Sequence, residues 1–215
     1  MKSRLFLIHT VILVHAALFS HAQEDWKLKL DEDGITVYTK PHTDSKIKAL
    51  RVICTVKATL SQIAAVLMDV KSQDEWSYHL KSTLLLQVSP IEVYYYAELI
   101  FPFPFDNRDF VVHMKLYQNP DTRIVTIDVL NVPDYIGQKK GIVRVLNSSC
   151  KWVITPVGAD SATIEFTLFA DPGGFVPAWL INIFSSYGPF ESFKKLRVQL
   201  KKPAYQNMHL SYITE

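Results

Sequence analysis

The most informative stretch of this sequence reads Asp171-Pro172-Gly173-Gly174-Phe175-Val176-Pro177-Ala178-Trp179-Leu180-Ile181-Asn182. Its first four residues end a strand and turn the chain, because two consecutive glycines permit the positive φ angles that other residues avoid. Pro177 suits the first position of a helix, and Pro203 closes that helix. The segment therefore predicts a passage from the last strand into a long C-terminal helix over about residues 177–202.

The predicted C-terminal helix has two different halves. From Trp179 to Phe184 it is apolar on almost every side, whereas from Phe193 onward apolar residues alternate with lysine and arginine. We expect the first half to be the buried one. The pair Gly188-Pro189 should bend or break the helix in its middle, because proline lacks a backbone N–H and clashes with the preceding turn.

Upstream of this helix the residue pattern is mostly that of strands. β-branched and aromatic residues at a spacing of two predict a hairpin from strands 34–40 and 47–56. Residues 60–70 change to a helical period, with Ser61 as the expected N-cap. Seven further strands are predicted in series: 80–88, 91–101, 108–118, 122–131, 141–147, 150–157 and 162–170. Their short connections favour an antiparallel meander, which must curl to avoid long open edges.

These elements predict an α+β fold in which a curved antiparallel sheet wraps around the long C-terminal helix, the arrangement called a helix-grip. A helix that is apolar on every side needs apolar partners on both of its faces. An internal cavity with an apolar ligand would supply one of those partners. The pattern alone does not distinguish a hollow interior from a filled core.

The first 22 residues have the layout of a signal peptide. Lys2 and Arg4 precede an apolar run from Leu5 to Phe19, and Ser20-His21-Ala22 places small residues at the expected cleavage positions. The run is shorter than the roughly 20 residues that span a bilayer, which makes a retained anchor the weaker interpretation. We therefore expect cleavage after Ala22 and export to the periplasm or the medium.

The mature chain, residues 23–215, is expected to be one domain. Removal of residues 1–22 lowers the 23 basic residues to 21, which balances the 21 acidic residues. A chain without net charge has no general attraction for nucleic acid, so this partner is disfavoured. No repeat or linker divides the roughly 190 residues, a length that suits a single core without disulfides.

Only two cysteines are present, Cys54 and Cys150. They form no C-x-x-C pair of the metal-binding or redox type. An exported chain could oxidise them to a bridge, provided that the two Cα atoms lie within about 7 Å. The alternative is that Cys54 is a small buried hydrophobic residue of its strand.

Several segments in order resemble the START (StAR-related lipid-transfer) domain family, in a secreted or periplasmic form of bacterial type. They are Trp76, Phe101-Pro102-Phe103-Pro104, Asn107-Arg108-Asp109-Phe110-Val111, Trp152 with Pro156, and the stretch from Asp171 to Asn182. The similarity spans roughly residues 25–203. It implies a helix-grip fold around a tunnel for one lipid or sterol-like molecule.

Strand 108–118 is the most informative about the ligand. Alternation places Phe110, Val112, Met114 and Leu116 on one face, which we expect to line the tunnel. Many START domains carry an arginine six residues after the arginine of the motif, where this chain has Met114. The departure favours an uncharged ligand, unless Arg144 or another inward polar group substitutes. Met114 as a plain core residue is the alternative.

The expected ligand-binding residues of the helix are Leu180, Ile183, Phe184 and Tyr187. The loop Phe101-Pro102-Phe103-Pro104-Phe105 is unusually apolar, and its prolines cannot donate to a sheet ladder. We expect Phe101, Phe103 and Phe105, together with Phe175 and Trp179, to form a gate that contacts membrane surfaces transiently. The alternative is a static plug of the core.

Three other features have two interpretations each. Glu98 is either an outward, solvated residue or a buried carboxylate with a raised pKa that faces the ligand. Trp76 is either the anchor of its short helix or a wall of the tunnel. Asn107-Arg108-Asp109 is expected to fix a loop through hydrogen bonds or an ion pair rather than to take part in chemistry.

The function that these features favour is binding, and possible transfer, of a mostly apolar molecule by a monomer without cofactor or metal. An enzyme on the same scaffold, similar to cyclases or hydrolases, is the first alternative. The chain has no G-x-S-x-G or nucleotide-binding motif, and its mature histidines, His42, His79, His113 and His209, show no metal-ligand spacing. No catalytic residue is therefore predicted. A filled domain that binds another protein is the second alternative.

Overall fold

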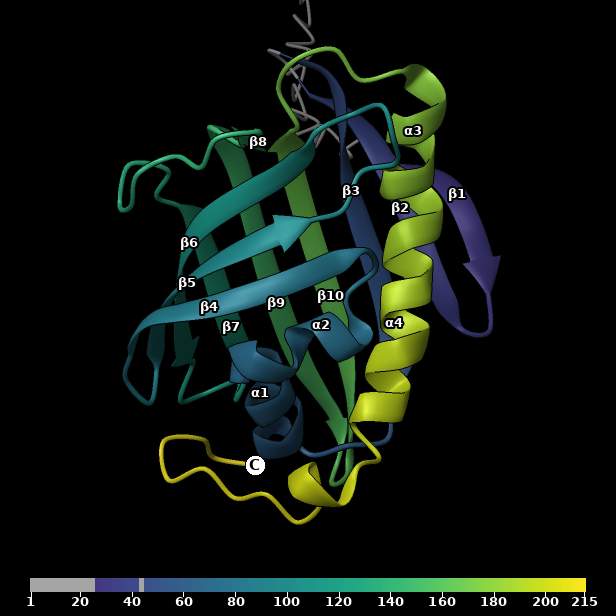
Figure 1. Cartoon of the computed structure of the whole chain (residues 1–215). Coiled ribbons are helices and arrows are strands. Elements are labelled where there is room, and N and C mark those ends of the chain that lie inside the picture. The colour runs from purple at the N-terminus through teal and green to yellow at the C-terminus, as the bar shows by residue number, and fades with distance from the viewer. Residues whose placement is uncertain (1–25, 43–44) are drawn as a thin grey trace, which may run out of the picture.

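The structure is a computed structural model that describes residues 26–42 and 45–215. The predicted signal peptide, residues 1–22, lies outside this described part. Within it the predicted fold class is confirmed: a strongly curved antiparallel sheet embraces a long C-terminal helix (Figure 1).

Ten strands form one sheet. The first three are β1 (Lys27–Glu32), β2 (Ile35–His42) and β3 (Ser45–Val56). The other seven are β4 (Leu80–Val88), β5 (Glu92–Leu99), β6 (Asn107–Gln118), β7 (Val125–Asn131), β8 (Ile142–Arg144), β9 (Asn147–Gly158) and β10 (Ser161–Asp171). The helical elements are α1 (Leu60–Met68), η1 (Val70–Ser72), α2 (Gln73–Trp76), α3 (Ala178–Asn182), η2 (Ile183–Tyr187), α4 (Gly188–Gln199) and η3 (Pro203–Tyr205).

The spatial order of the sheet is β1-β2-β3-β10-β9-β7-β6-β5-β4, with the short β8 paired to β6. The last strand, β10, thus lies between β3 and β9, and this pairing joins the N-terminal hairpin to the meander. The sheet curls so that β4, β5 and β6 pass in front of β9 and β10 (Figure 1). The helices α1 and α2 and the C-terminal helix close the open side of this curl.

Two strands differ from the sequence prediction. β1 was not predicted, because Leu28 and Leu30 are its only apolar residues and the segment around them is polar and mostly exposed. β8 is much shorter than the predicted strand 141–147 and pairs with β6 in parallel rather than as part of the antiparallel meander. The position of β8 depends on its contacts with β6, which lies about 35 residues earlier in the chain. A local sequence pattern does not predict contacts over such a separation.

The N-terminus of α1 also differs from the prediction. Thr59, not Ser61, is the N-cap, and its hydroxyl accepts a hydrogen bond from the Gln62 backbone N–H at 3.2 Å. Ser61 lies inside the helix and its Oγ accepts from the Leu210 backbone N–H at 3.3 Å. Thr59 and Ser61, which are two positions apart, both satisfy the sequence rule for an N-cap, so only the backbone geometry distinguishes them.

The C-terminal helix is one spiral of three parts, α3, η2 and α4, in which η2 is a wider π-helical turn. The predicted interruption at Gly188-Pro189 takes this form. Pro189 cannot donate a backbone hydrogen bond, and the wider turn just before it accommodates the missing bond without breaking the helix.

The burial of the two helix halves is the reverse of the prediction. Phe190, Phe193, Leu196 and Leu200 of the C-terminal half are all buried in the main core. In the first half Trp179 remains 54% exposed and Tyr187 52% exposed. The first half of the helix therefore places apolar side chains both on the surface and in the interior.

The unpaired edge of β4 is covered by η1 and α2, which pack against it. Covering an edge in this way protects unpaired backbone groups from other chains. Among the described residues, no helix has both the length and the apolar character needed to cross a membrane.

Candidate functional site

Two adjoining cavities lie between the curved sheet and the C-terminal helix, with volumes of about 130 and 230 Å³. They share three wall residues, Leu99, Leu168 and Phe184, and are therefore adjacent chambers. We call the smaller one the loop-end chamber, because the β10–α3 loop contributes Pro172 and Val176 to it. The larger one, under α2 and the start of α4, is the central chamber.

The loop-end chamber has mostly apolar walls. Its apolar lining residues include Ile47, Leu50, Phe101, Phe110, Val145 and Ile181, and its polar ones are Arg108, Ser185 and the exposed Lys48. The central chamber is lined by apolar and uncharged polar residues. Its remaining lining residues include Leu67, Gln73, Trp76, Ser77, Tyr95, Met114, Val129, Cys150, Trp152, Phe166 and Phe193. A concave, mainly apolar space with a few polar groups is the usual form of a small-molecule site.

Arg108 is the one buried cation of the loop-end chamber. Its Nε donates to the Pro172 carbonyl at 3.1 Å, and its Nη2 to the Gly173 carbonyl at 3.0 Å. Its Nη1 donates to the Asp106 carbonyl at 2.6 Å, and the guanidinium lies over the Phe101 ring. Burial lowers the pKa of Arg108 from its usual value. The predicted loop-fixing role fits this geometry, whereas the sequence did not indicate that Arg108 also lines a cavity.

Arg108 holds the turn that the sequence analysis singled out. Gly173 and Gly174 have the expected positive φ angles, +65° and +61°. The Gly173 N–H donates to the Asp171 carboxylate at 3.0 Å, which closes the turn. The strand β6 and the entry into α3 are thereby joined through one buried side chain.

The expected inward face of β6 is present. Val112, Met114 and Leu116 are buried in the main core, and Phe110 packs against it. Phe110 lines the loop-end chamber and Met114 the central chamber. Val112 and Leu116 belong to the core, and neither is among the lining residues of the two chambers.

The helix residues predicted to bind ligand occupy different places. Phe184 lies in the wall that the two chambers share. Leu180 is buried behind the walls, and Tyr187 is half-exposed with its ring against Tyr78. The side chain of Ile183 lies outside the described part. Ile181, which the sequence analysis did not select, lines the loop-end chamber.

The Phe/Pro loop separates into an inner and an outer part. Phe101 is buried, lines the loop-end chamber and stacks on Phe184, with ring centroids 4.7 Å apart. Phe103 is 96% exposed, and Phe105 is partly buried. Only Phe101 therefore occupies the position of a plug, and Phe103 faces away from the chambers.

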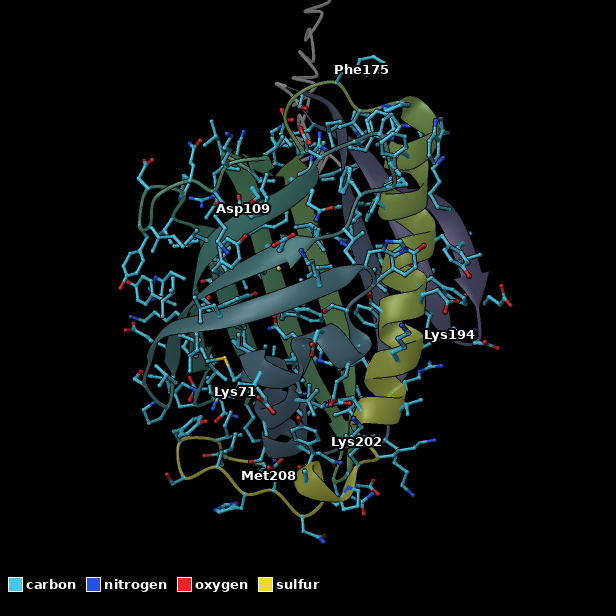
Figure 2. The ribbon with its side chains drawn as sticks, viewed as in Figure 1. Lys71, Asp109, Phe175, Lys194, Lys202 and Met208 are labelled. Atoms are coloured by element: carbon cyan, nitrogen blue, oxygen red, sulfur yellow. The ribbon has the colours of Figure 1, made fainter. Side chains whose placement is uncertain are left out.

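Exposed apolar side chains accompany this loop. Phe175, on the loop before α3, is 82% exposed and stands at one end of the molecule (Figure 2). Trp179 and Ile100 are also exposed. The β5–β6 loop and α3 lie side by side at this end (Figure 1). Large apolar side chains of this kind are expected at sites that contact proteins or membranes.

Glu98 and Arg144 both face away from the chambers and are buried. Glu98 is thus outward, but the expectation that it is solvated was wrong. Its Oε1 accepts from Lys81 Nζ at 2.8 Å and from Asn107 Nδ2 at 2.7 Å. Burial acts to raise the pKa of Glu98, but these two hydrogen bonds outweigh it and lower the pKa from its usual value.

Arg144 forms a bidentate ion pair with Asp109, at 2.7 and 3.1 Å. Its Nη groups also donate to the carbonyl oxygens of Pro133, Ile136 and Gly137. Every direction of the guanidinium is thereby used to hold the segment between β7 and β8 against β6. Arg144 does not line either chamber and cannot substitute for an arginine at position 114.

Trp76 combines its two predicted roles. It ends α2, lines the central chamber and packs edge-on against Trp152, with ring centroids 6.2 Å apart. Cys54 and Cys150 are both free. Cys54 on β3 pairs with Ile164 of β10, and Cys150 on β9, the strand on the other side of β10, pairs with Leu168. The two cysteines are thus separated by two strand spacings and by four residues along the strands. Their Cα atoms are therefore well beyond the roughly 7 Å that a disulfide bridge permits.

In residues 26–42 and 45–215 no three His, Cys, Asp or Glu side chains converge to hold a metal ion. The polar groups of the lining residues are the Arg108 guanidinium, the Lys48 ammonium, the Gln73 amide, two indoles, several hydroxyls and a thiol, all of which are able to form hydrogen bonds. The fold and the chambers define the class as a helix-grip protein with an internal apolar binding space.

Comparison with known proteins assigns the family. The START domain profile matches residues 11–205, and the chain belongs to this family. An uncharacterized protein of Pseudomonas aeruginosa is 32% identical over 83% of this chain and 88% of its own length. The phosphatidylcholine transfer protein of Rattus norvegicus is 28% identical over 86% of both chains. The crystal structure of a STAR-related lipid transfer protein from Xanthomonas axonopodis, 32% identical, superposes with a TM-score of 0.75 over 82% of this chain and 99% of that one.

Proposed function

We propose that the protein binds a mostly apolar, uncharged lipid or sterol-like molecule in the two chambers and transfers it between membranes. The observation that carries this proposal is the pair of adjoining chambers between the sheet and the C-terminal helix. Membership in the START family and the lipid-transfer names of its relatives support it. We propose further that the protein acts as a monomer, by binding rather than catalysis, without a cofactor.

The chemistry of the walls supports an uncharged ligand. No charged side chain lines the central chamber, where Met114 stands on the inward face of β6. Arg108, in the loop-end chamber, already donates to three backbone carbonyls. An anionic headgroup would have to give up its hydration without gaining a free cation in the central chamber, which is unfavourable.

The gate in this proposal consists of the Phe/Pro loop and α3. The stacked rings of Phe101 and Phe184 close the loop-end chamber from the side of the helix. The wider turn η2, before Pro189, is where α3 would move relative to α4 to separate these rings. Phe103, Phe175 and Trp179 would enter the membrane surface during exchange, since they are exposed at the same end.

The double variant Phe103→Ser/Phe105→Ser tests the gate. Phe103 is almost fully exposed, so its loss should change the melting temperature little, whereas partial insertion of each phenylalanine into lipid is worth up to roughly 1.5–3 kcal/mol. We expect transfer between phosphatidylcholine vesicles to fall at least tenfold. Leu130→Ser is the control, because it also replaces an exposed apolar side chain by serine, but on β7 and outside the proposed gate. Early unfolding with unchanged transfer per folded molecule would show that the loop is only part of the core.

We also propose that the protein is exported and that the mature chain begins at Gln23. Support comes from Lys2, Arg4 and the apolar run that ends before Ser20-His21-Ala22. The test is the intact mass of the protein isolated from periplasm or medium, which should lack residues 1–22. A membrane-bound form that retains them would refute the proposal.

A further inference from the structure

Three side chains form the wall that the two chambers share, and one of them belongs to the C-terminal helix. Leu99 lies on β5 and Leu168 on β10, and each of these strands is paired with a neighbour on both sides. Phe184 lies in the wider turn η2. The two backbone ladders fix the positions of the leucines, whereas an irregular helical turn leaves Phe184 more freedom.

The Phe184 ring is held in the shared wall by other aromatic rings. It stacks on Phe101, with the ring centroids 4.7 Å apart and an angle of 15° between the ring planes. Tyr78 and His79 approach it edge-on, with centroids at 6.1 and 5.9 Å. Aromatic contacts of this kind are weak compared with the burial of several methylene groups. An alkyl chain that gains enough buried surface is therefore able to displace the ring.

Both sides of the shared wall can bury an alkyl chain. Phe110 and Ile181 are among the apolar residues of the loop-end chamber, and Val129 and Phe166 are among those of the central chamber. A chain that occupies both chambers must pass the shared wall. The position of the Phe184 ring thus decides whether a ligand has only the central chamber, about 230 Å³, or both chambers at its disposal.

We infer that Phe184 is a specificity-determining residue, whose ring is a partition that sets the chain length above which a ligand must open the passage between the chambers. A chain that fits the central chamber leaves the ring stacked on Phe101. A longer chain displaces the ring and loses its aromatic contacts, so the methylene groups that pass the wall add less affinity. This inference rests on the proposed function and deepens it, because the ring that closes the gate also selects the ligand by length.

A series of saturated fatty-acid methyl esters, from octanoate to icosanoate, tests the inference with uncharged probes. Binding is followed by the fluorescence of Trp76 and Trp152, which line the central chamber. Each methylene group that is freely buried should lower the Kd roughly fourfold. In the wild type we expect this gain to break off where the chain reaches the partition. In Phe184→Ala it should continue, so that the longest esters bind at least about tenfold more tightly than to the wild type, and the shortest equally well.

Phe184→Leu and Phe190→Leu are a matched pair, because both make the same change in the C-terminal helix. Phe190 is buried, but it is not among the lining residues of either chamber. Phe184→Leu should move the break toward longer esters, and it keeps the test valid if Phe184→Ala does not fold. Phe190→Leu should leave the break at the wild-type chain length.

Three results would overturn this inference alone. They are a uniform gain over the whole series in the wild type, a break at the same chain length in both Phe184 variants, and an equal displacement of the break by Phe190→Leu. The last result would mean that loosening of the helix is sufficient. Failure of every ester to bind to the wild type would overturn the proposed function and the inference with it.

Discussion

Single residues set the electrostatics of the binding space. Met114 stands on the inward strand face in a chamber without charged walls, and Arg108 is the only buried cation among the described lining residues of the two chambers. Three backbone carbonyls occupy Arg108, so its charge organises the β10–α3 turn. The walls of the chambers therefore present mostly methylene, ring, amide and hydroxyl groups, and the only other cation among their described lining residues is the exposed Lys48 of the loop-end chamber.

The first prediction concerns Met114. Met114→Arg would place an unpaired cation in the central chamber, at a cost of several kcal/mol even after the surroundings relax. We expect binding of neutral lipid, measured per folded molecule by native mass spectrometry, to fall at least tenfold. Met114→Leu should bind normally. Undiminished uptake of every neutral lipid by Met114→Arg would mean that the residue does not line the occupied space.

The second prediction concerns pH and Glu98. Hydrogen bonds from Lys81 and Asn107 lower the pKa of Glu98 in the folded protein. A lowered folded-state pKa stabilises the protein above the unfolded-state pKa of about 4.3, and this stability is lost as pH falls through the folded-state value. Glu98→Gln should therefore be less stable than the wild type at pH 7, with a difference that shrinks below about pH 4. Urea denaturation at several pH values would show this, and parallel curves for the two proteins would contradict it.

At the scale of elements, the two halves of the C-terminal helix differ in how firmly they are packed. α4 is buried against the sheet through Phe193 and Leu196, whereas α3 keeps Trp179 exposed beside the loop. The wider turn η2 lies between them. A firmly packed half and a partly exposed half, separated by an irregular turn, are what a moving lid on a stable domain requires.

The chain end also contributes to an element far from it. The Glu215 carboxylate accepts from the backbone N–H groups of Leu60 and Ser61 at 2.8 and 3.0 Å, at the N-terminus of α1. A carboxylate there satisfies unpaired donors and complements the positive end of the helix dipole. The arrangement joins the last segment of the chain to the first helix.

The third prediction follows from this contact. Glu215→Ala should lower the free energy of unfolding by about 0.5–2 kcal/mol, the range for loss of an N-terminal cap. Urea denaturation gives this value, and hydrogen exchange should show faster opening at the start of α1. Glu215→Gln, which retains an acceptor oxygen, should lose less. Wild-type stability of the alanine variant would show that the contact does not contribute in solution.

At the scale of the whole molecule, the curved sheet forms a shell around the two chambers. The two chambers leave wall residues such as Phe110, Leu168 and Phe184 without full contact on one side. Apolar surface that faces an empty space loses dispersion contacts, and a ligand restores them. Stability and occupancy should therefore be coupled.

The fourth prediction measures this coupling. A ligand at 100 times its Kd stabilises a folded protein by about 2.7 kcal/mol. For a domain of this size that corresponds to a rise in Tm of roughly 5–10 °C. Protein extracted with organic solvent should melt lower by this amount than protein isolated from its host, and return of the extract should restore the Tm. Identical melting of both forms, with no small molecule in the extract, would indicate a filled domain.

The sequence by itself determined the features that depend on neighbours in the chain. The paired glycines at 173 and 174 required positive φ angles, and the alternation of β6 placed Phe110 and Met114 on the inner face, because strand geometry repeats every two residues. The order of strands followed by a proline-initiated helix was sufficient for the fold class.

Only the tertiary structure decided the features that depend on residues far apart in the chain. Glu98 is buried because Lys81 and Asn107 cover it, and Arg144 is removed from the ligand space because it pairs with Asp109. Gln73 of α2 and Tyr95 of β5 come to line the same chamber only in the folded molecule. Local periodicity carries no information on such pairs, since their energy comes from the three-dimensional packing of separate elements.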